Sequence, residues 1–470
     1  MMGTLVMKFG GSCVGTTSAL TQTLNIVLHE SHQWERLVLV VSALDGVTDV
    51  LIEATDMARL GDQRGYRRTV ANLRTRHVAL AGTLPLEINE KAALEAEIDR
   101  LLLEMLNLYQ DIANAHTQQE AMVHYDATIG MGERLTARIV AALIRQNGIP
   151  SVAIDGTGLI ITDDTIGSAT ATLTETQHRV TSHLNPILDR QIIPVVTGFI
   201  GTDSSGRTTT LGRGGSDYTA AILGSCLQAQ EVWIWTGVDG LMTADPQVIS
   251  SAQVIPRLSY EEVSELAYFG ARILHTHMME VLREQQIPVR VKNFRNPRRA
   301  GTLIHQYNPH TSHVIKAVTS IPGFGLTVPL SSVIPTLEEI VEQVVKAVPP
   351  GHADVATSSR SSTYYAVYFL TPTAAGPNAS HYIQTTLGSS LKANRNTQHW
   401  ELKPVSIITV IGDYLNEVSA VTAGILQVMS GIPILALMQG PTGCSLSLIV
   451  HVEQSTDALN RIHQLILNSG

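Results

Sequence analysis

Residues 207–217 concentrate groups that could bind an anion. Their sequence, RTTTLGRGGSD, contains two arginines, four hydroxyl groups, three glycines and one carboxylate. The stretch follows the apolar run 192–200 and precedes the helix-like segment 218–227. A glycine-rich turn between a strand and a helix offers backbone N–H groups and the positive end of the helix dipole. The pattern therefore predicts a binding site for a phosphate or a carboxylate.

Lys8 is a second candidate, because it lies at the end of the apolar run 5–9 and just before Gly10 and Gly11. Ligands of parallel sheets bind beyond the carboxyl ends of the strands. A lysine there could neutralise the charge of a phosphoryl group, while the glycines let the backbone approach it. The alternative is a strand-end lysine that extends into solvent. Neither GxxxxGK[ST] nor GxGxxG after a strand occurs, so the pattern is not that of a P-loop or a Rossmann dinucleotide site.

Two carboxylates near predicted helix starts allow more than one interpretation. Glu133 falls in the first turn of a helix predicted to begin near residue 130. It could stabilise the helix dipole, or it could face the ammonium group of a ligand. Asp217 precedes the helix predicted from Tyr218 and could cap that helix. The residues alone leave these alternatives open.

The elements that must position these groups are strands and helices in alternation. After the run 5–9, further apolar runs without polar alternation are separated by helix-like segments, and they span residues 36–41, 192–200 and 231–236, while residues 289–293 are predicted as a last strand. Unbroken apolar strands are typical of a parallel sheet that helices cover on both faces. About six strand–helix repeats fill residues 1–306 and predict an α/β fold.

The composition changes after residue 306. Residues 306–313 are polar and contain Asn308-Pro309, which is typical of a domain boundary. Beyond it, a helix at 337–348, a strand at 364–370 and a βαββα pattern over 405–467 predict two small α+β modules. We expect these modules to regulate or oligomerise the protein rather than to catalyse.

The overall composition excludes several classes of protein. The 470 residues are 44% hydrophobic and 16% charged, as expected for a well-packed globular protein. The net charge of −9 argues against non-specific binding of nucleic acid. Cys13, Cys226 and Cys444 are widely spaced, so neither a disulfide framework nor a zinc site is predicted. No signal peptide and no apolar run of about 18 residues is evident. We expect a cytoplasmic protein without membrane contacts.

Six motifs carry a resemblance to a known family. In chain order they are KFGGS (8–12), GERL (132–135), GFIG (198–201), the stretch 206–217, TGVDG (236–240) and FGARILH (269–275). Together they resemble the aspartokinases of the amino-acid-kinase superfamily, and the tail resembles the paired ACT domains of that family. The resemblance implies an αβα sandwich with a mainly parallel sheet over residues 1–306. It also implies ACT-like regulatory domains at 314–385 and 400–470.

The resemblance implies ATP-dependent phosphorylation of the side-chain carboxylate of L-aspartate to 4-phospho-L-aspartate, the first step toward lysine, threonine and methionine. A carboxylate is ionised at neutral pH, so it needs no general base. It needs in-line positioning and stabilisation of the transferred charge. We expect Mg²⁺ to be held mainly by the phosphates rather than by a protein metal site. The alternatives are a kinase of the same fold acting on another amino-acid carboxylate, or a catalytically weak amino-acid sensor.

The family motifs also assign roles to individual residues. Lys8 and Asp217 would be catalytic, with Asp217 orienting Lys8. Four residues would bind aspartate, namely Thr48, Glu133, Arg213 and Ser216. Ten would bind the nucleotide, namely Lys8, Gly10, Gly11, Ser12, Ser42, Thr236, Gly237, Met242, Gln247 and Arg272. Arg207 and the threonines at 208–210 are expected to shape their loop rather than to touch the reacting atoms.

Some residues depart from the family pattern, and the tail has its own predicted site. Gly237, Gln247, Arg272 and Thr276 replace residues that are common in the family, all on the nucleotide side. In the first ACT-like domain, Asp354 and Ser359 match positions that bind an effector, which would be lysine or threonine, and the alternative is a dimerisation module without an effector. The ACT-like domains would also form a homodimer or a higher homo-oligomer.

Overall fold

The computed structural model describes residues 2–270, 274, 276–306, 315–329, 336–348, 352–371, 378–393, 400–415 and 419–469. The chain forms two compact units. The first contains residues 1–241 and 274–306, and the second contains residues 242–273 and 307–470. Residues 242–273 thus belong to the second unit, although the predicted boundary at residue 306 would group them with the first.

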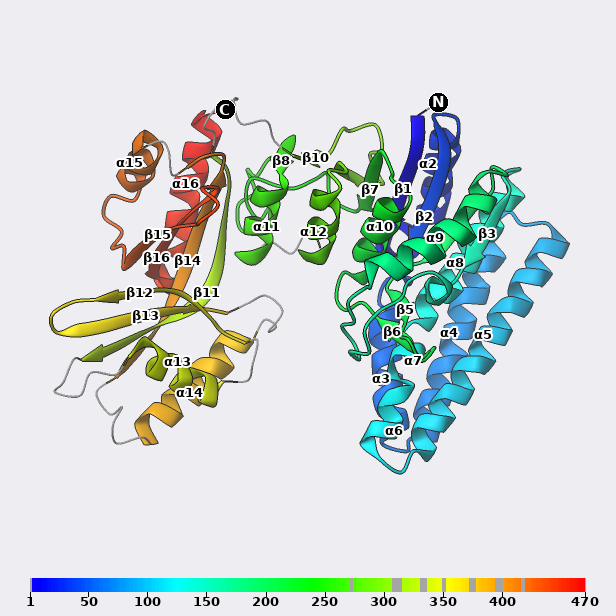
Figure 1. Cartoon of the computed structure of the whole chain (residues 1–470), viewed down its shortest axis with the longest axis horizontal. Coiled ribbons are helices and arrows are strands. Elements are labelled where there is room, and N and C mark those ends of the chain that lie inside the picture. The colour runs from blue at the N-terminus through cyan, green and yellow to red at the C-terminus, as the bar shows by residue number, and fades with distance from the viewer. Residues whose placement is uncertain are drawn as a thin grey trace. The chain divides into compact units, whose positions relative to one another are not determined.

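A mainly parallel sheet forms the centre of the first unit (Figure 1). Its strands follow the order β3-β4-β2-β1-β7-β9-β10. Their bounds are β1 (Met2–Phe9), β2 (Trp34–Val41), β3 (Ser151–Ile154), β4 (Ile193–Thr197), β7 (Glu231–Thr236), β9 (Val289–Asn293) and β10 (Thr302–His305). Neighbours from β3 to β9 pair in parallel, and β10 pairs antiparallel with β9. The predicted α/β class is confirmed.

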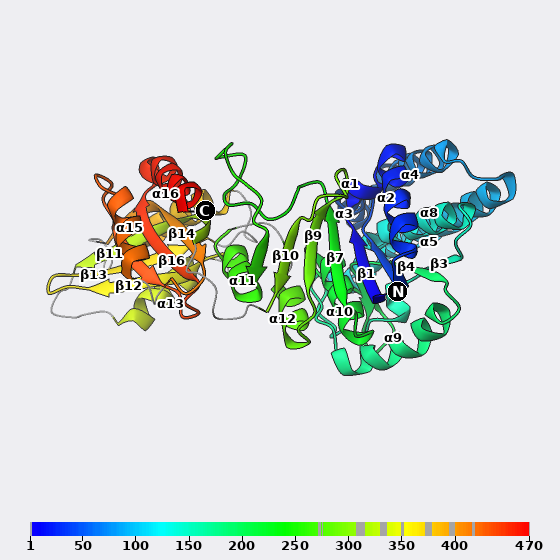
Figure 2. The same cartoon turned by 90° about the horizontal axis from the view of Figure 1, so that it is seen from above.

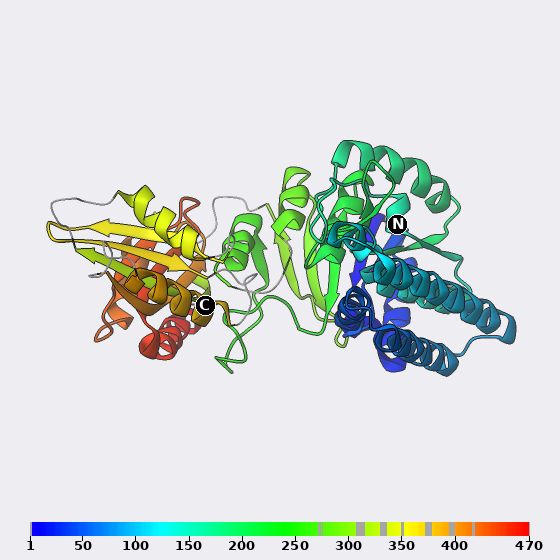
Figure 3. The same ribbon diagram turned by 90° about the horizontal axis from the view of Figure 1, so that it is seen from below.

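Helices cover both faces of this sheet, which is why its strands read as unbroken apolar runs. Figure 2 shows α2 and α8 on one face and α9 and α10 on the other. The helices of this unit are α1 (Gly11–Val14), α2 (Thr17–Ser31), α3 (Val47–Arg59), α4 (Gln63–Thr83), α5 (Ile88–Asn114), α6 (Gln118–Val123), α7 (Tyr125–Ile129), α8 (Met131–Gln146), α9 (Leu173–Leu188), α10 (Gly215–Cys226) and α12 (Thr276–Glu284). The long helices α4 and α5 lie side by side (Figure 3).

The second unit is built on an antiparallel sheet with the strand order β12-β13-β11-β14-β16-β15. The strands are β11 (Ile315–Pro329), β12 (Asp354–Arg360), β13 (Tyr364–Leu370), β14 (Glu401–Gly412), β15 (Ala436–Gln439) and β16 (Ser445–His451). The helices are α13 (Leu337–Ala347), α14 (Ala379–Ala393), α15 (Ser419–Val428) and α16 (Ser455–Ser469). The segment 242–273 adds β8 (Arg257–Ser259) and α11 (Tyr260–Tyr268).

The long strand β11 joins the two predicted ACT-like modules. Its first half contributes Ile315 and Val318 to a core with residues of α15 and α16. Its second half contributes Phe324 and Leu326 to a core with residues of α13 and α14. The strand therefore belongs to both modules, which form one continuous sheet.

Candidate active site

Lys8 and Asp217 form an ion pair at the carboxyl end of β1. Lys8 Nζ lies 2.6 Å from Asp217 Oδ1, and the two side chains are only 13% and 11% exposed. Limited exposure makes the attraction stronger than that of a surface pair, because water screens it less. The predicted contact between these residues is present, while their catalytic roles stay a prediction.

The turn after β1 packs closely against the turns after β2 and β7. A Cβ on Gly11 would lie 2.9 Å from the carbonyl oxygen of Ala43, so only glycine fits there. The backbone N–H of Ser42 donates to the carbonyl of Phe9 at 3.1 Å. A Cβ on Gly237 would lie 3.9 Å from Ser12 Oγ. Three turns that carry predicted nucleotide contacts therefore meet at one edge of the sheet.

Glu133 lies in the first turn of α8 and is only 3% exposed. Its Oε1 accepts a hydrogen bond from the backbone N–H of Ala43 at 3.0 Å. Its Oε2 is buried and has no hydrogen-bond partner among the described residues. Burial raises the pKa of Glu133 to about 7, against the smaller lowering effects of the Ala43 N–H and of Lys8. A buried carboxylate oxygen without a partner is costly, so this oxygen would gain from a cationic partner.

The turn before α10 differs from its predicted form. Gly214 has a φ of 76°, and the helix begins at Gly215, three residues before the predicted start at Tyr218. Asp217 therefore lies inside the first turn, and its predicted capping role is wrong, because the residue at the cap position is Gly214. The early start directs the carboxylate of Asp217 toward Lys8.

Ser216 is 7% exposed and lies against Gly198. A Cβ at Gly198 would come within 2.6 Å of both Cβ and Oγ of Ser216. Phe199, which follows Gly198, has a φ of 72° and donates its backbone N–H to Thr219 Oγ1 at 3.0 Å. The GFIG motif thus holds the turn that positions Ser216.

Arg213 and Thr48 are the remaining predicted aspartate ligands. Arg213 is exposed, and its guanidinium has no hydrogen bond or ion pair within the part of the chain that the structure describes. Thr48 is partly buried in the first turn of α3. Both side chains are thus able to contact a ligand from solvent.

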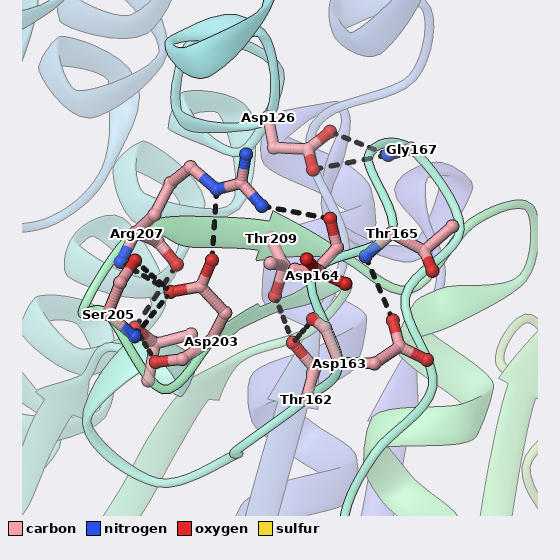
Figure 4. A network of polar contacts seen from close by, with 11 residues as sticks. Asp126, Thr162, Asp163, Asp164, Thr165, Gly167, Asp203, Ser205, Arg207 and Thr209 are labelled. Carbon is pink, nitrogen blue, oxygen red and sulfur yellow. Dashed lines mark hydrogen bonds and ion pairs between the residues drawn. The ribbon is translucent and has the colours of Figure 1, made fainter.

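A polar network supports the hairpin of β5 (Ile200–Thr202) and β6 (Thr208–Thr210) (Figure 4). Arg207 Nε donates to Asp203 Oδ2 at 3.0 Å, and Arg207 also donates to the carbonyl of Asp164 at 2.8 Å. The hydroxyl groups of Thr209 and Thr162 lie 2.7 Å apart. These contacts agree with the expectation that Arg207 and the threonines shape their loop.

Asp126 is a structural residue of this region that sequence reasoning missed. It is 2% exposed. One oxygen accepts from Thr210 Oγ1 at 2.8 Å, and both lie 3.1 Å from the backbone N–H of Gly167. Burial raises the pKa of Asp126. Nothing in its surroundings in the sequence marks it, because its partners lie 41 and 84 residues away along the chain.

The other predicted contacts lie elsewhere. Thr236 ends β7 beside the turns described above. Met242 and Gln247 belong to the second compact unit, so their contact with a nucleotide stays a prediction. Arg272 lies outside the described residues.

The predicted effector residues lie in β12, at the edge of the sheet of the second unit. Asp354 and Ser359 are both exposed. A β-bulge between Val355 and Thr357 inserts one extra residue. Because of that residue, Asp354 and Ser359 face the same side of the strand despite their odd spacing.

The described ranges contain no group of three or more His, Cys, Asp or Glu side chains that could hold a metal ion. None of their helices has the length and apolar character that a membrane crossing requires.

Comparisons with known proteins agree with this geometry. A model of the amino acid kinase family matches residues 3–293. The chain is similar to the bifunctional aspartokinase/homoserine dehydrogenase of Haemophilus influenzae, with 26% identity over 478 residues that cover 99% of this chain and 56% of that protein. It is similar to aspartokinase 1 of Arabidopsis thaliana, with 33% identity over 321 residues that cover 67% of this chain and 54% of that protein.

The chain spans about half the length of the curated relatives it matches. Among solved structures, it is similar to aspartokinase III of E. coli in complex with aspartate and ADP. The identity is 25% and the TM-score 0.76, over 98% of this chain and 99% of that one. Because the family model covers more than half of the residues, and the fold agrees with it, the chain belongs to the amino acid kinase family.

Proposed function

We propose that the chain phosphorylates the side-chain carboxylate of L-aspartate with ATP, forming 4-phospho-L-aspartate and ADP. The observation that carries the proposal is the buried Oε2 of Glu133, which has no partner among the described residues. A free amino acid supplies the ammonium group that such an oxygen requires. Two comparisons support aspartate as the substrate. The chain is similar to proteins named aspartokinases, and aspartokinase III of E. coli is in complex with aspartate and ADP.

In this proposal four side chains hold the substrate. Glu133 takes the α-ammonium group, and Arg213 takes the α-carboxylate with its planar fork of donors. Thr48 and Ser216 contact the remaining oxygens. These contacts place the side-chain carboxylate, one oxygen of which is the nucleophile.

The chemical step requires no proton transfer. A side-chain oxygen of aspartate attacks the γ-phosphorus of ATP, and the bond from that phosphorus to the β,γ-bridging oxygen breaks, so ADP leaves with the electron pair. Lys8 stabilises the negative charge that moves during this step. Asp217, 2.6 Å from Lys8 Nζ, keeps the ammonium group in place.

The nucleotide is proposed to lie over the turns after β1, β2 and β7. Gly10, Gly11, Ser12 and Ser42 contact its phosphates. The rest of the nucleotide contacts four side chains and one glycine, namely Thr236, Gly237, Met242, Gln247 and Arg272.

Mg²⁺ is proposed to enter the site bound to the phosphates of ATP. This ion keeps several waters and needs only one or two protein carboxylates besides substrate phosphates. Because Asp217 is paired with Lys8 at 2.6 Å, the phosphates rather than this carboxylate would supply most of the contacts of the ion. When bound, the ion would neutralise phosphate charge, while Lys8 and the glycine turn act from the protein side.

The release of ADP from ATP and Mg²⁺ tests the substrate assignment. We expect it with L-aspartate, and much less with L-glutamate or N-acetyl-L-glutamate. The N-acetylated compound lacks the ammonium group that Glu133 is proposed to bind. Equal or faster ADP release with N-acetyl-L-glutamate would contradict the assignment.

The kcat/KM for aspartate is expected to rise as the pH increases through about 7, because burial raises the pKa of Glu133 to about 7. Below this pKa the carboxyl is neutral and attracts an ammonium group weakly, so kcat/KM should fall about tenfold per pH unit. Aspartate itself does not titrate there. The Glu133→Gln variant should be less active and should lose this dependence, whereas a flat wild-type profile through pH 7 would refute the role.

Gly198→Ala is expected to raise the KM for aspartate about 10- to 100-fold, since small displacements of positioning groups cost that much. The added Cβ would lie 2.6 Å from Ser216 Oγ and would displace that side chain. Steady-state kinetics with aspartate varied at saturating ATP measures the effect. Gly158→Ala is the matched control, because nothing lies within 4 Å of a Cβ there. An unchanged KM in Gly198→Ala would remove Ser216 from the aspartate site.

Regulation, assembly and location complete the proposal. The ACT-like fold supports binding of lysine or threonine near Asp354 and Ser359, and a homodimer or higher homo-oligomer through these domains. The cytoplasm, where cysteines stay reduced, is the location that fits the free thiols of Cys13, Cys226 and Cys444. A rise in melting temperature with lysine or threonine would support the effector site, and no rise with either would refute it.

A further inference from the structure

Lys292 is a buried cation that the proposed reaction does not use. It lies in β9 and is only 9% exposed. Its Nζ lies 4.6 Å from the ring centroid of Trp233 and 5.1 Å from that of Trp235. Among the described residues it forms no ion pair. Burial lowers the pKa of Lys292, so its ammonium group would gain from a negative partner.

Lys292 lines a pocket of about 770 Å³ between α2 and the turn that follows β9. The volume is in the range of small-molecule sites, about 300 to 1,000 Å³. His29 and Glu30 of α2 form one wall, and Arg295, Arg298 and Arg299 form the other. Glu30 is the only carboxylate among the lining residues that the structure describes.

The charges of the pocket do not balance. Arg299 pairs with Asp239 at 2.6 Å. Arg295 and Arg298 form no ion pair within the described ranges. With Lys292, three cations thus face the single carboxylate of Glu30, which leaves an excess of two positive charges. The whole chain has a net charge of −9, so this excess is a local feature.

A purely structural role explains only part of this arrangement. A lysine over tryptophan rings gains about 0.5 to 2 kcal/mol from the cation–π contact. That contact accounts for the position of Lys292 but not for the exposed Arg295 and Arg298 that line the same pocket. Like charges that share one pocket are stabilised when an anion lies between them.

We propose that this pocket binds a small dianion, a phosphate or a dicarboxylate, with Lys292 as its central contact. Arg295 and Arg298 supply the flanking donors, and the excess of two positive charges matches the charge of the ligand. The pocket shares no residue with the proposed aspartate and ATP contacts. It does border the loop after β7, because Arg299 of the pocket pairs with Asp239 at 2.6 Å.

Titration of the full chain with inorganic phosphate and, separately, with succinate tests the proposal by tryptophan fluorescence. The readout is local, since Trp233 and Trp235 contact Lys292 and the chain has only four tryptophans. Saturating ADP and Mg²⁺ keep the proposed nucleotide site filled. We expect saturable binding of at least one anion, and its identity distinguishes the two ligand classes.

Substitutions identify the site. Lys292→Met keeps the apolar stem and should weaken binding about 10-fold or more, as expected for a lost hydrogen bond to a charged group. Arg298→Ala should weaken it as well, whereas Lys292→Arg should retain binding. Arg68→Ala, an exposed arginine of α4, controls for general charge effects. Lys292 has no ion-pair partner among the described residues, so its replacement leaves no partner charge uncompensated, and we expect Lys292→Met to fold.

Three results would overturn the proposal. The first is no saturable fluorescence change of the wild-type protein with either anion. The second is an equal Kd for the wild type and Lys292→Met. The third is a loss in Arg68→Ala as large as that in Lys292→Met, which would indicate attraction by net charge alone. None of these results bears on the kinase activity, which is measured separately by ADP release.

Discussion

Lys8→Ala is expected to lower kcat about 10²- to 10³-fold, which is the usual cost of removing one group that stabilises a transition state electrostatically. The KM for aspartate should change little, because Lys8 is assigned to the transferred phosphoryl group rather than to the amino acid. Its partially buried position, with 13% of the side chain exposed, strengthens the field that it exerts. Steady-state kinetics with each substrate varied in turn measures both constants.

A double-mutant cycle separates Lys8 from Asp217. Because Asp217 is assigned to hold Lys8 at 2.6 Å, Asp217→Asn should also lower kcat. The combined variant should be scarcely slower than Lys8→Ala alone, since groups that act as one unit are not additive. Fully additive losses would show that Asp217 acts on the substrates independently. A raised aspartate KM with unchanged kcat in Lys8→Ala would contradict the role of the lysine.

Arg213→Ala is expected to raise the KM for aspartate about 10- to 100-fold, since a hydrogen bond to a charged group contributes about 1.5 to 3 kcal/mol. The KM for ATP should stay nearly unchanged. Because the side chain is exposed, the fold should tolerate its loss. Kinetics with each substrate varied at saturation of the other measures the difference.

Two further variants control this result. Arg213→Lys keeps the charge but loses the planar fork, so its KM should be intermediate. Arg190→Ala removes another exposed arginine of the same unit and should behave like the wild type. An equal loss of affinity for aspartate and ATP in Arg213→Ala would refute its assignment to the amino acid.

Much of the first unit can be predicted from the sequence, because its signals are local. The unbroken apolar runs that became β1, β2, β4 and β7 reflect burial on both faces, and glycine turns mark where these strands end. The position of Lys8 just before Gly10 and Gly11 places it at the ligand edge of the sheet. Its 2.6 Å contact with Asp217 follows from the two turns meeting there.

Other features depend on tertiary contacts that leave no local signal. The sequence left two roles open for Glu133, and only its burial against Ala43, with one oxygen unpartnered, favours a ligand contact. The predicted start of α10 is three residues late. Gly214, in a left-handed conformation, occupies the cap position, so the helix begins before the apolar residues that the prediction relied on. Lys292 lies in a predicted strand. Its pocket is formed by the turn that follows this strand and by α2, which is far away in the sequence.

The units show the same limit on a larger scale. Residues 242–273 come directly after the TGVDG motif of the predicted kinase domain. Ala244 and Ile249 nevertheless join the core that contains residues of α15 and α16. Motif order does not indicate which core a segment joins. Likewise, the length of β11 lets it serve both ACT-like modules, which periodicity within either module does not reveal.

The decisive measurement is the identity of the product formed from ATP, Mg²⁺ and L-aspartate in the presence of hydroxylamine. Hydroxylamine converts an acyl phosphate into a stable hydroxamate, which mass spectrometry identifies. We expect aspartyl hydroxamate to form in proportion to ADP, and to depend on the chain, on ATP and on aspartate. ADP release without aspartyl hydroxamate above the enzyme-free background would contradict the proposed function.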